Sequence, residues 1–117
     1  MTIFSMSKDV QGQNAFAPAF SDLNKGVNLA VGAEQHFTVP ALTDATQFRN
    51  WLVIFSIEPG SNVFVDNIGT AAAFSGTLGA TTSILNPAAR IVKPGSVISL
   101  ITPDTTAYCG MSFYLSP

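Results

Sequence analysis

Charged side chains are scarce in this sequence. Five Lys and Arg and seven Asp and Glu make up 10% of the 117 residues, whereas a typical soluble domain carries roughly 25%. The net charge of -2 and the pI of about 4.9 cannot neutralise a row of phosphates, which dominates affinity for nucleic acids. Direct binding of nucleic acid is therefore disfavoured.

Soft metal ligands and long apolar runs are also missing. Cys109 is the single cysteine and His36 the single histidine, which excludes an internal disulfide and a four-ligand zinc site of Cys and His. No run approaches the ~18 apolar residues of a membrane helix, and no basic leader precedes an apolar segment as in a signal peptide. We expect no metal, no cofactor and no membrane contact, and synthesis in a cytoplasm.

What the sequence does contain is many short apolar runs, with 47% hydrophobic residues in total. In residues 1–26 polar residues interrupt isolated aromatics, Phe4, Phe16 and Phe20, with no period of 2 or 3.6. We interpret this segment as an extended N-terminal arm, and residues 27–117 as one domain. The three phenylalanines either fold back on this domain or anchor on a neighbouring subunit.

From Val27 onward, β-type runs alternate with turn residues and no helix of useful length is predicted. We expect a hairpin of Val27–Val31 with Gln35–Val39, and a second one in which Glu58-Pro-Gly60 joins Phe48–Ile57 to Val63–Asp66. Weak strands are expected at 73–78 and 83–85, an edge strand at 90–93, and strands at 97–101 and 107–115.

This pattern predicts an all-β fold of about eight strands, an antiparallel two-sheet β-sandwich of jelly-roll-like type. An immunoglobulin-like sandwich is the second choice, because the Cys-Trp-Cys arrangement of antibody domains is absent.

Two strands have informative faces. Ala107, Cys109, Met111, Phe113 and Leu115 alternate with Tyr108, Gly110, Ser112 and Tyr114, which predicts the first set inside and the tyrosines outside with wet hydroxyls. Phe48–Ile57 is apolar on both faces, so it is either a central strand covered on both sides or one covered by a partner chain.

Residues capable of catalysis do not form a recognisable motif. His36 would need an orienting carboxylate and a nucleophile within about 3 Å to act as a base; Glu34 is two residues away, and a surface histidine on a strand is the simpler interpretation. Cys109 is expected to be a buried, inert thiol. The acidic residues sit mostly beside turn residues, which favours turn formation over catalysis or metal binding: Glu34, Asp44, Glu58, Asp66 and Asp104.

An apolar sequence with so little charge indicates a surface that is covered by protein, since soluble monomers usually keep charged surfaces. We therefore expect a non-enzymatic assembly protein. The candidate contact residues for another subunit or shell are aromatic: Phe4, Phe16, Phe20, Trp51, Phe55, Tyr108 and Tyr114.

Three segments carry a resemblance to a known family: Glu58-Pro-Gly-Ser-Asn-Val-Phe-Val-Asp66 with Asn67-Ile-Gly-Thr70, and Lys93-Pro-Gly-Ser-Val-Ile-Ser-Leu100. Over roughly Gly32 to Leu115 the chain resembles the small β-sandwich decoration, or cement, proteins of tailed bacteriophage heads. The shared pattern is one of strands and turns, without a diagnostic motif.

The resemblance implies a virion protein on the capsid exterior that bridges major capsid subunits and stabilises the head, with the arm as a strap. It would also associate with itself, as a homotrimer or, next, a dimer. The alternative is a receptor- or carbohydrate-binding module of a phage tail or fibre, with Trp51, Tyr108 and Tyr114 stacking on sugars. A hydrolase or isomerase on a cupin-like barrel needs a histidine cluster that one histidine cannot supply.

Overall fold

The computed structural model describes residues 2–8, 10–11, 14–42, 49–67 and 83–116; for residues 6–8 and 14–18 it describes the backbone alone. The described residues form ten strands and no helix. The strands are β1 (Met6–Lys8), β2 (Asn14–Pro18), β3 (Leu23–Ala30), β4 (Gln35–Thr38), β5 (Asn50–Ile57), β6 (Phe64–Asn67), β7 (Ile84–Leu85), β8 (Ala89–Val92), β9 (Val97–Ile101) and β10 (Thr106–Ser116).

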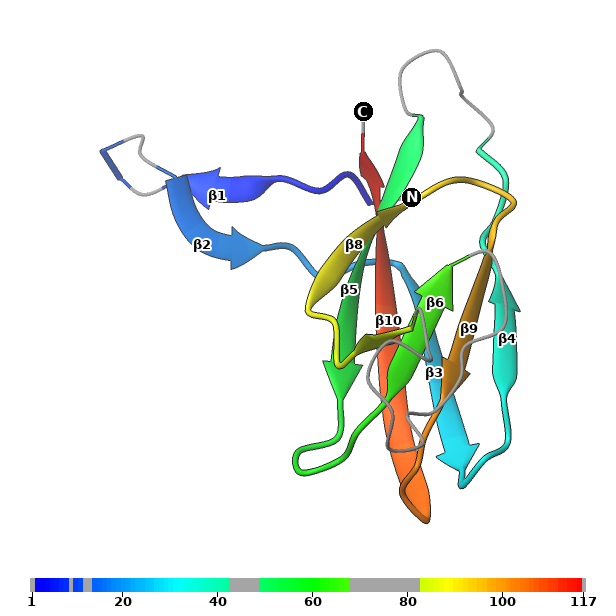
Figure 1. Ribbon diagram of the computed structural model, residues 1–117. Helices are drawn as coiled ribbons and strands as arrows, with labels where there is room; N and C mark the ends of the chain where they lie inside the picture. Colours follow the sequence, from blue (N-terminus) through cyan, green and yellow to red (C-terminus); the bar gives the residue numbers. More distant parts are fainter. Residues whose placement is uncertain (1, 9, 12–13, 43–48, 68–82, 117) are drawn as a thin grey trace.

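Eight of these strands form two antiparallel four-stranded sheets that pack face to face (Figure 1). The first sheet has the order β3-β10-β5-β8 and the second the order β4-β9-β6-β7. Apart from β6 and β7, each strand from β3 to β10 lies in the opposite sheet from the strand before it. The predicted all-β sandwich is confirmed, and this alternation gives it the strand order of a jelly roll.

Both predicted hairpins are wrong. β3 pairs with β10 while β4 pairs with β9, so the turn at Gly32 carries the chain from one sheet to the other. The same holds for β5 and β6, which lie in different sheets on either side of the turn at Gly60. A tight turn sets a local reversal of the chain but does not decide whether the two strands pair or face each other across a core. The predicted strand at 73–78 lies outside the described residues.

The two Pro-Gly-Ser turns share one geometry. The Ser61 amide donates to the Glu58 carbonyl (3.1 Å), and the Ser96 amide donates to the Lys93 carbonyl (3.2 Å). Gly60 and Gly95 have φ of 81° and 80°, as a type II turn requires. Each turn joins the two sheets, β5 to β6 and β8 to β9. Since β5 pairs with β8 and β6 with β9, the two Pro-Gly-Ser turns belong to two adjacent, antiparallel β-arches.

The core lies between the sheets and is centred on β10. Its predicted inward residues, from Ala107 to Leu115, are all buried, which confirms that prediction. Trp51 of β5 packs its ring edge-to-face on Phe113 at a centroid distance of 6.1 Å, and Phe37 of β4 contacts the same ring at 5.3 Å. One aromatic cluster thus joins both sheets.

The N-terminal arm is built differently from the expected extended segment. β1 and β2 pair with each other and form a two-stranded ribbon that extends sideways from the sandwich (Figure 1). The arm ends sooner than predicted, because β3 begins at Leu23 and pairs with β10 from there on. The short segment 23–26, predicted as arm, therefore belongs to the first sheet.

Candidate functional site

Two of the predicted contact residues, Trp51 and Phe55, are core residues. Trp51 has no exposed surface, and its Nε1–H donates to the Pro40 carbonyl (3.0 Å). Phe55 is 9% exposed and belongs to the same core cluster. The two residues point to the core face of β5, whereas Leu52 and Ile54 form the half-buried outer face. Trp51 therefore cannot reach a partner or stack on a sugar without opening the core, which corrects the expectation for this residue.

Phe4 and Tyr114 contact each other at the base of the arm. Their rings meet edge-to-face with centroids 5.5 Å apart. The Tyr114 hydroxyl donates to the Ala19 carbonyl (2.6 Å) and the side chain is buried. Tyr114 does lie on the outer face of β10, as predicted, but the arm covers it, so the expected solvated hydroxyl is wrong.

Backbone hydrogen bonds hold the base of the arm against β10. The Leu115 amide donates to the Thr2 carbonyl (2.8 Å), and the Phe4 amide donates to the Leu115 carbonyl (3.1 Å). From the other end of the arm, the Ser21 hydroxyl donates to the Phe113 carbonyl. The start and the end of the arm are thus fixed on the last residues of the same strand.

A polar clasp joins these two ends. The Thr2 amide and hydroxyl both donate to Asp22 Oδ1 (3.0 and 2.9 Å), and the Asp22 amide donates to Thr2 Oγ1 (3.0 Å). The hydrogen bond from the Thr2 hydroxyl lowers the pKa of the Asp22 carboxyl, because it stabilises the ionised form.

The arm also presents apolar side chains to solvent, one within its base and one in the turn of the ribbon. Phe20 is fully exposed at 101%, and so is Val10, in the turn of the ribbon, at 104%. The side chain of Phe16 lies outside the described part of the structure. Both side chains are thus accessible to a neighbouring protein.

Tyr108 is the other predicted contact residue that remains accessible, with 45% of its surface exposed. It lies on the outer face of β10, opposite Asn28 of β3. Thus Phe20 and Tyr108 are exposed, Phe4 and Tyr114 are held together at the base of the arm, and Trp51 and Phe55 are internal.

His36 lies beside Glu34, as its sequence position suggested, and beside Ser99, which the sequence did not reveal. Its Nδ1 lies 2.9 Å from the Ser99 hydroxyl on the paired strand β9, and its Nε2 lies 3.8 Å from Glu34 Oε1. This is the composition of a catalytic triad, but Ser99 has no exposed surface. A nucleophile that substrate cannot reach does not catalyse, so the contact is a structural link between β4 and β9.

Two other potentially reactive residues, Cys109 and Asp104, also have structural roles. Burial raises the pKa of the Cys109 thiol to about 11, so the inert protonated form dominates near neutrality. Asp104 Oδ2 accepts a hydrogen bond from the Asn62 amide (2.7 Å) and thereby ties two loops together. No group of three or more His, Cys, Asp or Glu that could hold a metal occurs in the described ranges, and Asp44 lies outside them.

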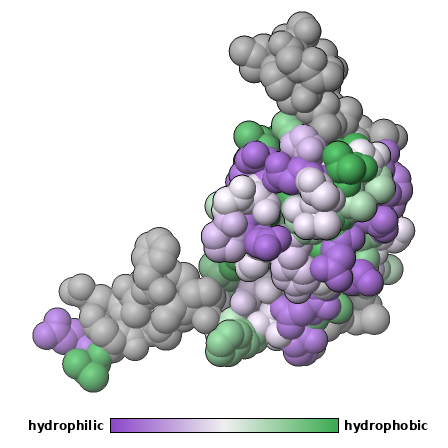
Figure 2. All heavy atoms as spheres, turned by 90° about the horizontal axis from the view of Figure 1, so that it is seen from below, coloured by the Kyte–Doolittle hydropathy of each residue, from purple (hydrophilic) through white to green (hydrophobic). Residues whose placement is uncertain are grey.

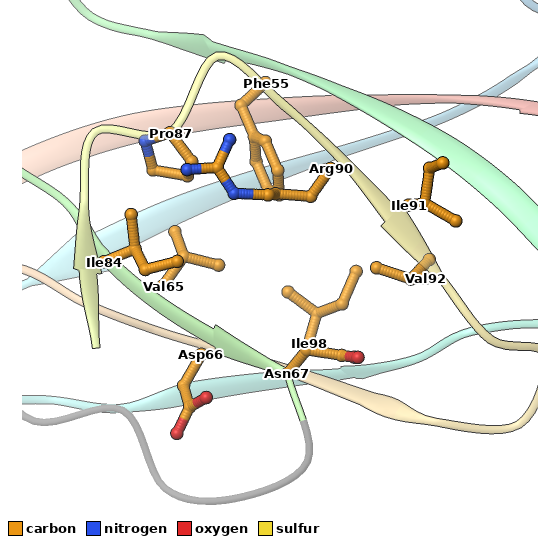
Figure 3. A pocket seen from close by; sticks show the side chains of 10 residues that line it. All are labelled: Phe55, Val65, Asp66, Asn67, Ile84, Pro87, Arg90, Ile91, Val92 and Ile98. Atoms are coloured by element: carbon orange, nitrogen blue, oxygen red, sulfur yellow. The ribbon is translucent and has the colours of Figure 1, made fainter. Parts of the chain in front are cut away.

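The sequence did not predict an apolar pocket at the open edge of the sandwich, where β7 and β8 lie (Figure 3). Its cavity of about 180 Å³ opens between the two sheets. Figure 3 shows apolar side chains from both sheets turned toward one another, with the Asp66 carboxylate pointing away. The lining residues are Phe55, Val65, Asp66, Asn67, Ile84, Pro87, Arg90, Ile91, Val92 and Ile98. No set of converging polar groups of the kind that orients a substrate lies among them.

The end of the sandwich seen in Figure 2 mixes hydrophilic and hydrophobic residues without one large apolar area. Two of the strand-joining loops are polar: the Asn62 amide donates to Asp104 Oδ2 (2.7 Å), and the Asp104 amide donates to Thr102 Oγ1 (3.1 Å). This end is therefore an ordinary solvated surface, and the exposed aromatics of the arm and of β10 are the candidate contact points.

The part of the chain that the structure describes contains no helix able to cross a membrane. No protein-family model, no curated protein and no solved structure matches this chain.

Proposed function

We propose that this chain is a structural virion protein that binds the outside of a phage capsid shell, bridges neighbouring major capsid subunits and stabilises the head. The observation that carries the proposal is the arm: its two-stranded ribbon is anchored at the base and, in the described part of the chain, belongs to neither sheet of the sandwich. The resemblance to phage decoration proteins supplies the identity of the partner.

The ribbon is a poor structure for an isolated monomer. It belongs to neither sheet of the sandwich, and a two-stranded hairpin alone is marginally stable in water. The molecule measures 49 × 31 × 25 Å with a radius of gyration of 15.6 Å, against about 13 Å for a compact domain of this size. Such an extension gains stability when a neighbouring protein covers it.

The base of the arm connects the ribbon to the central strand β10. Hydrogen bonds of Thr2, Phe4 and Ser21 to β10 hold both ends of the arm on the sandwich. Tension on the ribbon is thereby passed to the central strand of a sheet. Many copies on one shell convert modest contacts into high avidity, which suits a strap between subunits.

The competing assignment, a receptor- or carbohydrate-binding module of a tail or fibre, loses two of its three expected stacking residues, since Trp51 and Tyr114 are buried. Catalysis gains no support, because the His36 contact involves an inaccessible serine. A role in assembly is the function that the geometry favours.

The test is co-sedimentation with undecorated phage heads, comparing the full chain with a variant in which a short glycine-serine linker replaces residues 5–18. Both junctions, Phe4 and Ala19, contact Tyr114, so the linker spans a small gap and the base stays intact. We expect the full chain to saturate the heads at a symmetric stoichiometry and the variant to remain in the supernatant.

Phe20→Ala provides a matched point variant, because this fully exposed side chain contributes no packing to the monomer. We expect unchanged circular dichroism and thermal unfolding, with binding to heads weakened at least tenfold. Heads that bind the linker variant as well as the full chain would exclude the strap, and a full chain that ignores every shell would exclude the capsid role itself.

A further inference from the structure

The outer face of the first sheet contains a hollow beside Tyr108. Gly26 of β3 and Gly110 of β10 are directly paired, and the Tyr108 ring occupies the space above them. A Cβ at Gly26 would lie 2.5 Å from the Tyr108 hydroxyl and 3.2 Å from its ring carbons, and one at Gly110 would lie 3.6 Å from Cε1. The glycine pair therefore lets the ring lie down on the sheet while 45% of the residue stays exposed.

Short polar side chains close the other sides of this hollow, which has a volume of about 210 Å³. Ser112 follows Gly110 on the same face of β10, with Asn24 opposite it on β3, and Ser56 of β5 is opposite Gly110. The hydroxyls of Ser56 and Ser112 form no hydrogen bond within the described residues. The hollow thus has an aromatic ring on one side and unpaired serine hydroxyls on its other sides.

Among the residues that the structure describes around the hollow, Lys25 is the one charged residue. It pairs with the core residue Met111, so its side chain leaves β3 on the opposite face. An anionic or cationic ligand would find no partner here. A neutral ligand with an apolar face and several hydroxyl groups would find both kinds of contact.

We propose that this hollow binds a neutral sugar unit, with Tyr108 against its C–H face and the hydroxyls of Ser56 and Ser112 bonded to its hydroxyls. Asn24 Nδ2 already donates to the Ser21 carbonyl (2.8 Å), so Asn24 would contribute its Oδ1 as an acceptor. The site is separate from the arm and does not depend on the capsid role. A single ring and a shallow hollow give weak binding per site, so display of many copies sets the useful affinity.

The experiment applies the full chain to an immobilised panel of neutral oligosaccharides containing glucose, galactose, mannose or N-acetylglucosamine, and then follows titration with the best binder by NMR. Tyr108→Ala removes the aromatic contact, and we expect at least tenfold weaker binding. Tyr108→Phe keeps the ring and should bind within about threefold of the original.

Gly110→Ala is a second variant that tests the hollow rather than the ring. Its added Cβ meets the ring, the Ser56 Cβ and the Ser56 carbonyl at 3.6 to 3.7 Å, which are ordinary contacts, so the protein should fold while the floor of the hollow is raised. We expect at least tenfold weaker binding with an unchanged melting temperature.

Binding that is lost in Tyr108→Ala and in Gly110→Ala, with shifts confined to β3, β5 and β10, would support the site. No binding to any sugar of the panel would overturn the proposal, and so would binding that both variants leave intact.

Discussion

Tyr108 and Tyr114 lie on the same strand and on the same face, six residues apart, yet only one of them is a surface residue. Tyr108 is 45% exposed over a glycine pair, whereas Tyr114 is 5% exposed beneath the arm. Strand β3 pairs with β10 only as far as Phe113. At Tyr114 the arm takes over the position that β3 occupies beside Tyr108, with Phe4 and Ala19 as the covering residues.

The comparison shows that alternation along a strand selects a face but not its environment. Near Tyr114 the outer face of β10 is covered by the arm, and near Tyr108 the same face borders an open hollow. Chain segments distant in sequence determine which environment each tyrosine has. Three predictions test the difference between the two environments.

The largest difference between the two tyrosines is expected in the free energy of unfolding when each is replaced by alanine. Tyr114→Ala removes a buried ring and its contact with Phe4, so we expect a loss of about 3 kcal/mol in the free energy of unfolding. Tyr108→Ala should cost less, about 1 kcal/mol, because 45% of this residue is already exposed and only its contact with the glycine pair is lost. Urea unfolding of the two variants checks this, and equal losses would show that the arm does not cover Tyr114.

Removing only the hydroxyl sharpens the same comparison. Tyr114→Phe leaves the Ala19 carbonyl without its hydrogen-bond donor, and we expect a loss of about 1 kcal/mol. Tyr108→Phe should have no measurable effect on unfolding. If Tyr114→Phe is equally silent, the bond between Tyr114 and Ala19 does not hold the arm in solution.

The smallest effect concerns pH at the base of the arm. The pKa of Asp22 is lowered in the folded protein from its ordinary value of 3.8, chiefly by the hydrogen bond from the Thr2 hydroxyl. Its contribution is therefore complete above about pH 4 and is lost as the pH falls through the lower folded value. The protection factor of the Leu115 amide, which donates to Thr2, should drop in that range.

Asp22→Asn is the control for this last prediction. The amide cannot ionise, so the protection factor of the Leu115 amide should no longer respond to acid between pH 5 and 2. A drop that persists in this variant would assign the acid effect to another carboxyl.

Much of the sandwich could be predicted from local patterns. The alternation from Ala107 to Leu115 placed every inward residue correctly, because burial on one face of a strand leaves a period of two in the sequence. The Pro-Gly turns at Gly60 and Gly95 were equally readable, since positive φ favours glycine. The pairing of the strands could not be predicted, because a turn that joins two sheets has the same residues as one that closes a hairpin.

The candidate contact residues were harder to predict for a related reason. Strand β5 is apolar on both faces, so nothing in its sequence said that Trp51, rather than Leu52, would point to the core. The hollow beside Tyr108 had a signal in Gly26 and Gly110, but their pairing depends on the register of β3 with β10. The edge pocket likewise depends on how β7 and β8 approach from different sheets.

By itself the sequence determined the all-β class, the turns and the faces of β10, because each of these follows from neighbours within a few residues. Only the tertiary structure decided which strands pair, where the arm crosses β10, and which aromatic residues reach the surface. Those features depend on contacts between segments far apart in the chain, such as Ala19 with Tyr114. A local sequence pattern does not identify the distant segment that it will contact.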